Sequence, residues 1–157
     1  MPVGAADRST FAAAWQARLV TGFPLLAAMQ IEVGGDAADW WLTAPFAPNR
    51  NDHGTAFGAS ISTLATIAGW MGALLAGGTD CDAVIQSGST EFLHPITGAF
   101  HARPQPPGPD EIARAHAALR RGRPARLSLR VTVLDEGMRI AAQFEGRYVL
   151  SPCRPGQ

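Results

Sequence analysis

Lysine is absent from this sequence of 157 residues, so all 13 of its Lys or Arg positions are arginine. Without a lysine, the chain can form neither a Schiff base with a carbonyl substrate nor the phosphate contact of a P-loop lysine. The 13 arginines are balanced by 13 Asp and Glu residues, for a formal net charge of zero. The overall charge therefore gives no reason to expect binding to nucleic acid or to a membrane surface.

Cysteine is also scarce. Cys81 and Cys153 are far apart in the sequence, with no CxxC motif and no histidine cluster. This pattern excludes a zinc ribbon and a disulfide framework, and it favours a reducing cytoplasm as the location. We expect no metal and no cofactor. The first 18 residues lack the basic start and continuous apolar run of a signal peptide.

Charged residues are missing from Gly54 to Thr79, a stretch long enough to cross a bilayer. Its content is mostly Ala, Gly, Ser and Thr, a composition that inserts poorly as a single helix. A helix buried on all sides in the core of a soluble protein has the same pattern. The sequence therefore predicts a central core helix and no membrane span.

The first half of the chain contains helix and strand signals in alternation. Ser9 is expected to cap a helix that runs to about Leu19 and ends before Pro24. Alternating apolar residues predict strands over residues 29–33 and 40–44. After a polar loop, Thr55 is a plausible N-cap of the uncharged helix, which is expected to end near Gly77.

Strands are then predicted over residues 83–93 and 97–103, joined by a turn at Pro95, followed by a helix from Asp110 to about Arg121. Strict alternation over residues 127–133 and 138–148 predicts an antiparallel hairpin with one buried face. An antiparallel sheet must cover its apolar face, and one uncharged helix is the natural cover. We therefore expect an α+β fold in a single domain over residues 1–157, with a core at about 11–150.

The loop that leads into the central helix reads Asn51-Asp52-His53-Gly54-Thr55-Ala56-Phe57-Gly58-Ala59-Ser60. It resembles the signature of hot-dog-fold thioesterases, in which an Asn and a Gly precede a His-Gly-Gly-like step into the central helix. The resemblance implies the hot-dog fold, in which a sheet wraps around one helix. It also implies a homodimer, or a higher oligomer, with sites built at the interface.

Most of the chain, from about Phe11 to Leu150, resembles the thioesterase-like domain that often follows an acetyltransferase module in bacterial proteins. The stretches that carry this resemblance are Phe23-Pro24-Leu25, Ala44-Pro45-Phe46-Ala47-Pro48-Asn49, Gly54-Thr55-Ala56-Phe57-Gly58, Phe92-Leu93-His94-Pro95-Ile96-Thr97-Gly98 and Gly146-Arg147-Tyr148-Val149. Members of that family are described as thioesterases, and some decarboxylate malonyl-acyl carrier protein. The resemblance implies an acyl-CoA or acyl-acyl-carrier-protein substrate.

The start of a buried helix suits such a substrate, because its unpaired N–H groups and positive dipole end can stabilise a thioester oxyanion. Gly58 would let the substrate approach the backbone, and Asn51 could bond the carbonyl or orient a water. Two features of the hydrolase pattern are missing, since Phe57 replaces its histidine and Thr66 stands where its acid is expected. Decarboxylation needs no base to activate water, so we favour malonyl decarboxylation over hydrolysis.

Other residues have both a functional and a structural interpretation. Asp52 and His53 are candidate bases, although they are also ordinary loop residues. Asn49 is a candidate substrate contact or a turn residue, while Ser87 and Gly88 indicate a ligand contact or a β-bulge. Thr55, Phe57 and Ala59 are expected to line the substrate site at the helix start. Arg123 belongs to a basic cluster that could bind coenzyme A phosphates or a carrier protein, or could simply be solvated.

A hydrolase with a base from the loop or from the partner subunit remains an alternative, as does a dimer that binds acyl groups without chemistry.

Overall fold

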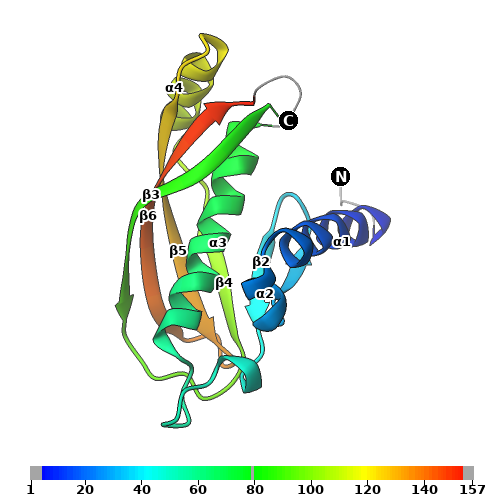
Figure 1. Cartoon of the computed structure of the whole chain (residues 1–157), viewed down its shortest axis with the longest axis vertical. Helices are drawn as coiled ribbons and strands as arrows, with labels where there is room; N and C mark the ends of the chain where they lie inside the picture. The colour runs from blue at the N-terminus through cyan, green and yellow to red at the C-terminus, as the bar shows by residue number, and fades with distance from the viewer. Residues whose placement is uncertain (1–4, 79, 154–157) are drawn as a thin grey trace.

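The computed structural model describes residues 5–78 and 80–153, which form four α-helices, a short 3₁₀ helix and six strands (Figure 1). In chain order these are α1 (Ala5–Gly22), α2 (Pro24–Ala28), β1 (Glu32–Gly35), β2 (Trp40–Ala44), η1 (Ala47–Asn49), α3 (Gly58–Gly77), β3 (Cys81–Phe92), β4 (Phe100–Gln105), α4 (Pro109–Arg120), β5 (Ala125–Asp135) and β6 (Ile140–Pro152).

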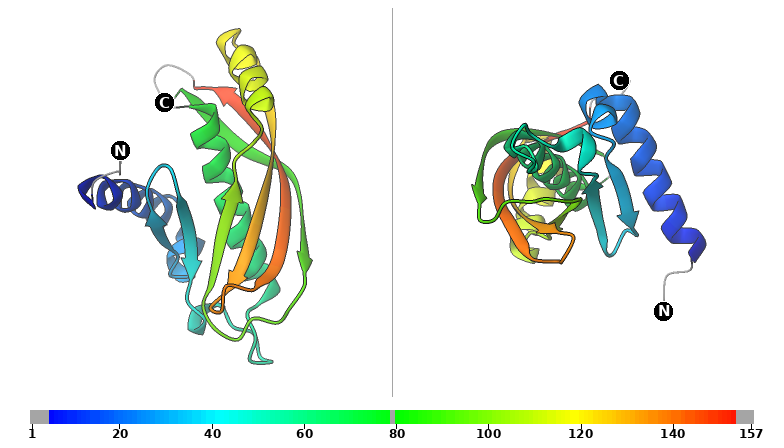
Figure 2. Two further views of the ribbon diagram at one scale, coloured as in Figure 1. Left: turned by 180° about the vertical axis from the view of Figure 1, so that it is seen from behind. Right: turned by 90° about the horizontal axis from the view of Figure 1, so that it is seen from below.

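All six strands belong to one antiparallel sheet with the order β1-β2-β4-β5-β6-β3. The sheet curls around α3, as the views from behind and from below make clear (Figure 2). The predicted hairpin is confirmed as β5 and β6, with Leu129 opposite Gly146 and Val131 opposite Phe144. The predicted arrangement of a sheet wrapped around one helix is therefore correct.

The uncharged helix α3 lies in the concave face of this sheet. It is long and apolar enough to cross a membrane, yet Leu64, Ala68 and Met71 are completely buried against the strands. Tyr148 of β6 fixes the contact, because its hydroxyl donates to the Thr66 carbonyl at 2.7 Å. A Cβ at Gly69 would collide with the Tyr148 hydroxyl, so glycine is needed for this close approach. These contacts make α3 the core helix of the fold.

The predicted starts of two helices are wrong, and one helix was not predicted. Helix α1 begins at Ala5, so Ser9 lies inside it and not at its cap. Thr55 does not cap α3, because the helix begins only at Gly58 and Thr55 is bonded within the preceding loop. The extra helix α2 was not predicted, since five residues are too few to produce a periodic pattern.

The predicted turn between β3 and β4 is also incorrect. Pro95 lies between them in the sequence, yet these strands are not neighbours, because β5 and β6 lie between them in the sheet. The connection therefore crosses the end of the sheet, and β3 becomes an edge strand. Near Ser87, where the sequence predicted either a bulge or a ligand contact, the register with β6 shifts between Ile85 and Ser87.

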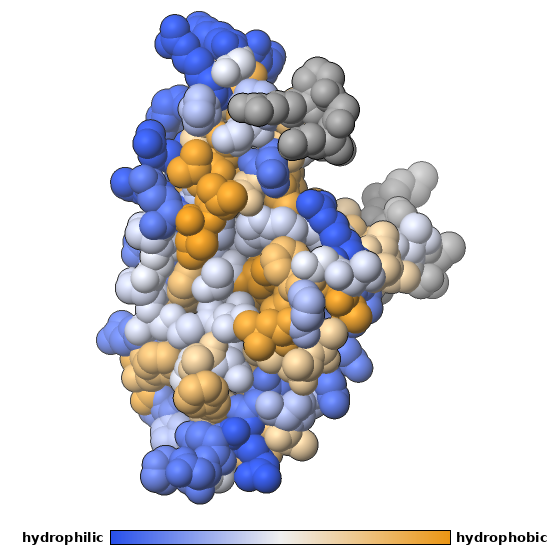
Figure 3. Space-filling model, viewed as in Figure 1, coloured by the Kyte–Doolittle hydropathy of each residue, from blue (hydrophilic) through white to orange (hydrophobic). Residues whose placement is uncertain are grey.

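The outer edge of β3 has no neighbouring strand among the described residues. This edge strand has 12 residues, and large apolar side chains along it are exposed, including Val84 at 60% and Phe92 at 54%. Unprotected edges of this length are uncommon, because their unpaired N–H and C=O groups pair readily with another strand. The surface view shows apolar area beside α3 on the β3 side (Figure 3).

Candidate active site at the start of the central helix

The start of α3 presents backbone donors for which residues 5–78 and 80–153 provide no hydrogen-bond partner. The first intrahelical bond runs from Ile61 N to Phe57 O, and no side chain caps the helix. The N–H groups of Gly58 and Ala59 precede that bond and therefore lack a partner in the helix. Gly58 is half-buried and Ala59 is exposed, so a ligand can reach these donors. The positive end of the helix dipole favours a developing negative charge here.

Phe92 at the end of β3 forms a wall beside this helix start. A Cβ at Gly58 would lie 3.5 Å from Phe92 Cζ, which is ordinary contact distance. Phe57, the residue directly before α3, has a side chain that is 53% exposed. Phe92 lies in a stretch that carries the family resemblance, but its closeness to Gly58 depends on how β3 pairs in the sheet and was not predicted.

A mostly apolar groove of about 350 Å³ continues from the helix start between α2 and α3. Its lining includes Ala59 and Thr66 of α3 and Leu25 of α2. The other lining residues are Phe23, Leu26, Ser62, Thr63 and Ile67. Thr66, which replaces the acid of the hydrolase pattern, therefore faces a groove large enough for a short acyl chain. Helix α2, unforeseen from the sequence, supplies one complete wall.

Asn51 is engaged within its own loop. Its Oδ1 accepts hydrogen bonds from the N–H groups of His53 and Thr55, at 2.9 and 3.1 Å, while its Nδ2 donates to Thr55 Oγ1 at 2.8 Å. The main chain closes the same loop, with Asn51 N donating to Thr55 O at 2.8 Å. One N–H of the amide remains for another group. The geometry is that of an Asx turn that shapes the approach to α3.

Asn49 is buried, with 1% of its surface exposed, and it joins three parts of the fold. Its side-chain Nδ2 donates to the backbone carbonyl oxygens of Met29 and Pro45, at 2.9 and 2.8 Å. The backbone carbonyl of Asn49 accepts the Phe57 N–H at 2.7 Å. Both N–H bonds go to carbonyls, so the orientation of the amide is determined. Asn49 Oδ1 is buried without a hydrogen-bond partner among the described residues.

Asp52 and His53 lie at the tip of the loop, in front of Gly54. Their side chains are 89% and 82% exposed, and Asp52 Oδ1 lies 3.6 Å from His53 Nε2. Because both side chains are exposed to solvent, the interaction between them is weak. Neither is held in a direction that would aim a proton at the helix start.

The remaining predicted residues lie elsewhere in the chain. Ser87 and Gly88 are in the middle of β3, several residues before Phe92 along the strand. Ser87 lies opposite Arg147, and Gly88 lies opposite Gly146 under the ring of Phe144. Arg123 follows α4, and this helix lies at the opposite end of the molecule from the start of α3 (Figure 1). A single chain therefore brings together only the residues from Asn49 to Ala59.

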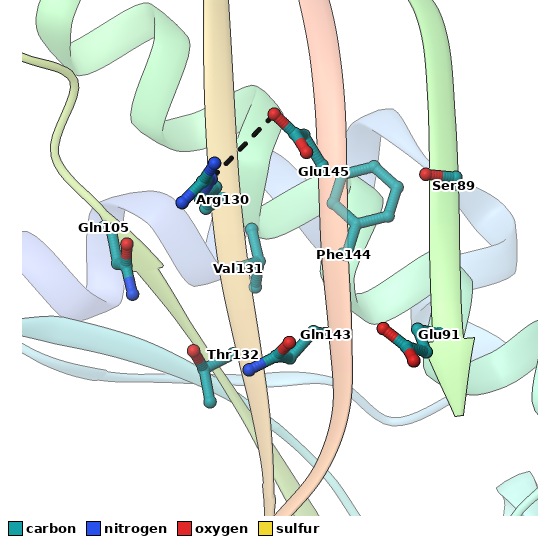
Figure 4. A pocket seen from close by; sticks show the side chains of 9 residues that line it. All are labelled: Ser89, Glu91, Gln105, Arg130, Val131, Thr132, Gln143, Phe144 and Glu145. Atoms are coloured by element: carbon teal, nitrogen blue, oxygen red, sulfur yellow. Dashed lines mark ion pairs between the residues drawn. The ribbon is translucent and has the colours of Figure 1, made fainter. Parts of the chain in front are cut away.

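A second hollow, of about 380 Å³, lies on the outer face of the sheet, away from α3 (Figure 4). Polar side chains from four strands line it, among them Glu91, Gln143 and Arg130, whose Nε is 3.9 Å from Glu145 Oε1. The N–H groups of the inner strands are already used in the sheet, so this face offers no backbone donors for an oxyanion. Among residues 5–78 and 80–153, no cluster of His, Cys, Asp or Glu could hold a metal ion.

A curved antiparallel sheet wrapped around one long helix, with open backbone donors at the helix start, is the hot-dog fold. A family model, YiiD_C, described as "Putative thioesterase (yiiD_Cterm)", matches residues 12–152. The chain therefore belongs to the YiiD_C family, and the resemblance inferred from its sequence is confirmed.

Solved structures agree with this assignment. A protein of unknown function, OLEI01261 from Chlorobaculum tepidum TLS, is 25% identical with a TM-score of 0.81, over 90% of this chain and 94% of that chain. A protein from Shewanella oneidensis, described as a "putative thioesterase", is 29% identical with a TM-score of 0.76, over 90% and 97% of the two chains. Thioesterase HI1161 from Haemophilus influenzae, at 11% identity, a TM-score of 0.66 and coverage of 90% and 92%, shares the fold.

The contacts of Asn49 predict a clear difference between the two asparagines. Replacing Asn49 with alanine removes both donors from the Met29 and Pro45 carbonyls, and it should lower the free energy of unfolding by about 1–3 kcal/mol. Replacing Asn51 with alanine should cost less, because water can satisfy the groups of its loop. Urea unfolding of the two variants tests this. Equal losses of stability would contradict the structural role given to Asn49.

Proposed function

We propose that this chain decarboxylates a malonyl thioester, carried on coenzyme A or acyl carrier protein, to the acetyl thioester. The thioester carbonyl would bind at the start of α3, where the N–H groups of Gly58 and Ala59 are open, and the acyl part would enter the groove between α2 and α3. Family membership and the thioesterase descriptions of similar proteins support an acyl-thioester substrate.

The proposed reaction breaks the bond between Cα and the carboxylate carbon. Carbon dioxide leaves, and the electron pair of that bond moves into the thioester carbonyl to give an enolate. Donors already aimed at the oxygen stabilise this charge without reorganising. The enolate then takes a proton at Cα from water, which completes the acetyl thioester. Apolar walls such as Phe92 and Leu25 favour the loss of charge from the carboxylate.

The observation that carries this choice is the absence of an oriented acid or base among the described residues at the helix start. Thr66 faces the groove where the hydrolase pattern has an acid, and Phe57 replaces the histidine. Asp52 and His53 are the candidates that the loop before α3 supplies, and both are almost fully exposed. Hydrolysis normally requires a base to activate water, whereas decarboxylation does not.

In this proposal Asn49 and Asn51 position the segment that leads into α3. The backbone carbonyl of Asn49 accepts the N–H of Phe57. Asn51 shapes the loop, and the second N–H of its side-chain amide is left for the substrate. Thioester hydrolysis is the second candidate, favoured by the thioesterase descriptions of the similar structures, and it would need a base from a partner subunit.

We also propose a cytoplasmic homodimer formed along the free edge of β3. Two copies related by a two-fold axis can pair their β3 edges in antiparallel fashion, which satisfies the edge N–H and C=O groups. The exposed side chains of Val84 and Phe92 would then contact the other copy. Because Phe92 also borders Gly58, each candidate site would lie beside this interface.

The test is incubation of the purified protein with malonyl-CoA and with malonyl-acyl carrier protein, with products identified by mass spectrometry. Acetyl thioester and carbon dioxide in equal amounts support the proposal. Free malonate and free thiol would establish hydrolysis in its place. If neither substrate is consumed while the dimer remains folded, the decarboxylation proposal is wrong.

A further inference from the structure

Five exposed arginines form one end of the molecule, here called the arginine pole. They are Arg114, Arg120, Arg121, Arg123 and Arg126, carried by α4, by the turn that follows it and by the start of β5. The described contacts pair none of them with a carboxylate, and the one polar contact is from Arg126 Nε to Gln86 Oε1 at 3.4 Å. The surface over α4 is the strongly hydrophilic end at the top of Figure 3.

The arginine pole is far from the candidate site of its own chain. Helix α4 lies beside the last turn of α3, where His116 Nε2 is 2.7 Å from the Ala76 carbonyl oxygen. The candidate site is at the first turn of α3, which has 20 residues and is therefore about 30 Å long. A substrate bound at Gly58 and a partner bound at the pole would thus be at opposite ends of the same chain (Figure 1).

The free edge of β3 runs between these two ends. Its first residue, Cys81, follows the end of α3 near the pole, and its last residue, Phe92, lies beside Gly58. Antiparallel pairing of two such edges reverses the second copy. It brings the pole of one copy to the end where the α3 of the other begins.

We propose that the arginine pole of one subunit docks an acidic acyl carrier protein whose acyl group reacts at the helix start of the other subunit. This inference rests on the proposed function and on the β3 dimer. The pantetheine arm of the carrier would extend from the pole to the groove beside Gly58. The proposed docking therefore gives the exposed arginines of the pole a function that they could not perform for the distant site of their own chain.

The form of the pole favours a protein over free coenzyme A. Its arginines are spread over a projecting helix and the turn at Gly122, whose φ is +68°. Small phosphates are held by donors that converge on one point, whereas spread positive charge matches a protein face with several carboxylates. The acidic residues of α4, Asp110 and Glu111, are confined to its first turn.

Charge-reversal variants test the docking. The triple change R120E/R121E/R123E should raise the KM for malonyl-acyl carrier protein roughly tenfold or more, with little change in kcat. The KM for malonyl-CoA and for the malonyl thioester of N-acetylcysteamine should stay the same. The matched control compares Arg123→Glu with Arg147→Glu, an exposed arginine in β6 on the outer face. An equal rise in KM for coenzyme A, or an equal effect of Arg147→Glu, would overturn the proposal.

A mixed dimer tests whether the pole acts across the interface. One subunit carries R120E/R121E/R123E and the other carries Gly58→Leu, with two affinity tags to isolate the mixed species. Docking across the interface leaves one complete site, so about half the wild-type rate should return at the wild-type KM. If the pole served its own chain, neither site would be complete and the raised KM would persist, which overturns the proposal.

A binding measurement keeps this inference separate from the proposed reaction. The affinity of a holo acyl carrier protein, measured by fluorescence anisotropy, should fall at least tenfold in the triple variant, roughly in line with its KM, and should be unchanged in Arg147→Glu. That result would support the docking even if no malonyl thioester is consumed. Equal binding to the triple variant and the wild type would overturn it, whatever the reaction proves to be.

Discussion

Replacing Gly58 with leucine should reduce kcat/KM for a malonyl thioester by about 10²–10³, the loss typical of a removed oxyanion donor. A leucine side chain would fill the space between α3 and Phe92 and cover the open N–H groups. The fold should persist, because leucine is a better helix former than glycine. Steady-state kinetics on the purified variant measure the effect.

Gly58→Ala is the matched control for this prediction. Its Cβ would lie 3.5 Å from Phe92 Cζ and 3.6 Å from Cε1, which are ordinary contacts, so activity should stay within about tenfold of the wild type. Nearly full activity in Gly58→Leu would mean that the thioester carbonyl does not bind at this helix start.

The second large effect is expected at the β3 edge. Changing Ile85, which is 41% exposed, to lysine should weaken dimerisation by more than about 100-fold, since a two-fold interface would bury the unpaired charge twice. Sedimentation equilibrium measures the dimer constant, and the rate should fall with the fraction of dimer because each site borders the interface.

Val20→Lys in α1 is the control for the edge prediction. Val20 is 38% exposed and lies in α1, which packs mainly against β1 and α2, so the same charge there should leave the dimer intact. A wild-type protein that is monomeric and fully active would contradict both the dimer and its role in the site.

The fold could be predicted where a local pattern decides the structure. The alternation over β5 and β6 reflects one buried face, and the uncharged run of α3 reflects burial on several sides. The path from β3 to β4 could not be predicted, because adjacent strands in the sequence normally pair and nothing local indicates a crossover. The contact of Gly69 with Tyr148 likewise joins distant segments.

The candidate site was only partly accessible from the sequence. The loop motif located the helix start to within three residues, since α3 begins at Gly58 and not at Thr55. Asn49 resembled a simple turn residue, because the carbonyl that it binds at Met29 is 20 residues away. Arg123 could be recognised as basic, but its distance from Gly58 depends on the tertiary structure.

The central claim is that an acyl thioester binds at the start of α3. The most direct test is titration of the ¹⁵N-labelled protein with a malonyl-CoA analogue that keeps the thioester carbonyl and carries a sulfonate in place of the carboxylate, so that it cannot lose carbon dioxide, followed by amide chemical shifts. The account predicts that the largest shifts occur at Gly58 and Ala59, with smaller shifts at Thr66 in the groove. Shifts concentrated at Glu91, Gln143 and Glu145, on the outer face of the sheet, would contradict it.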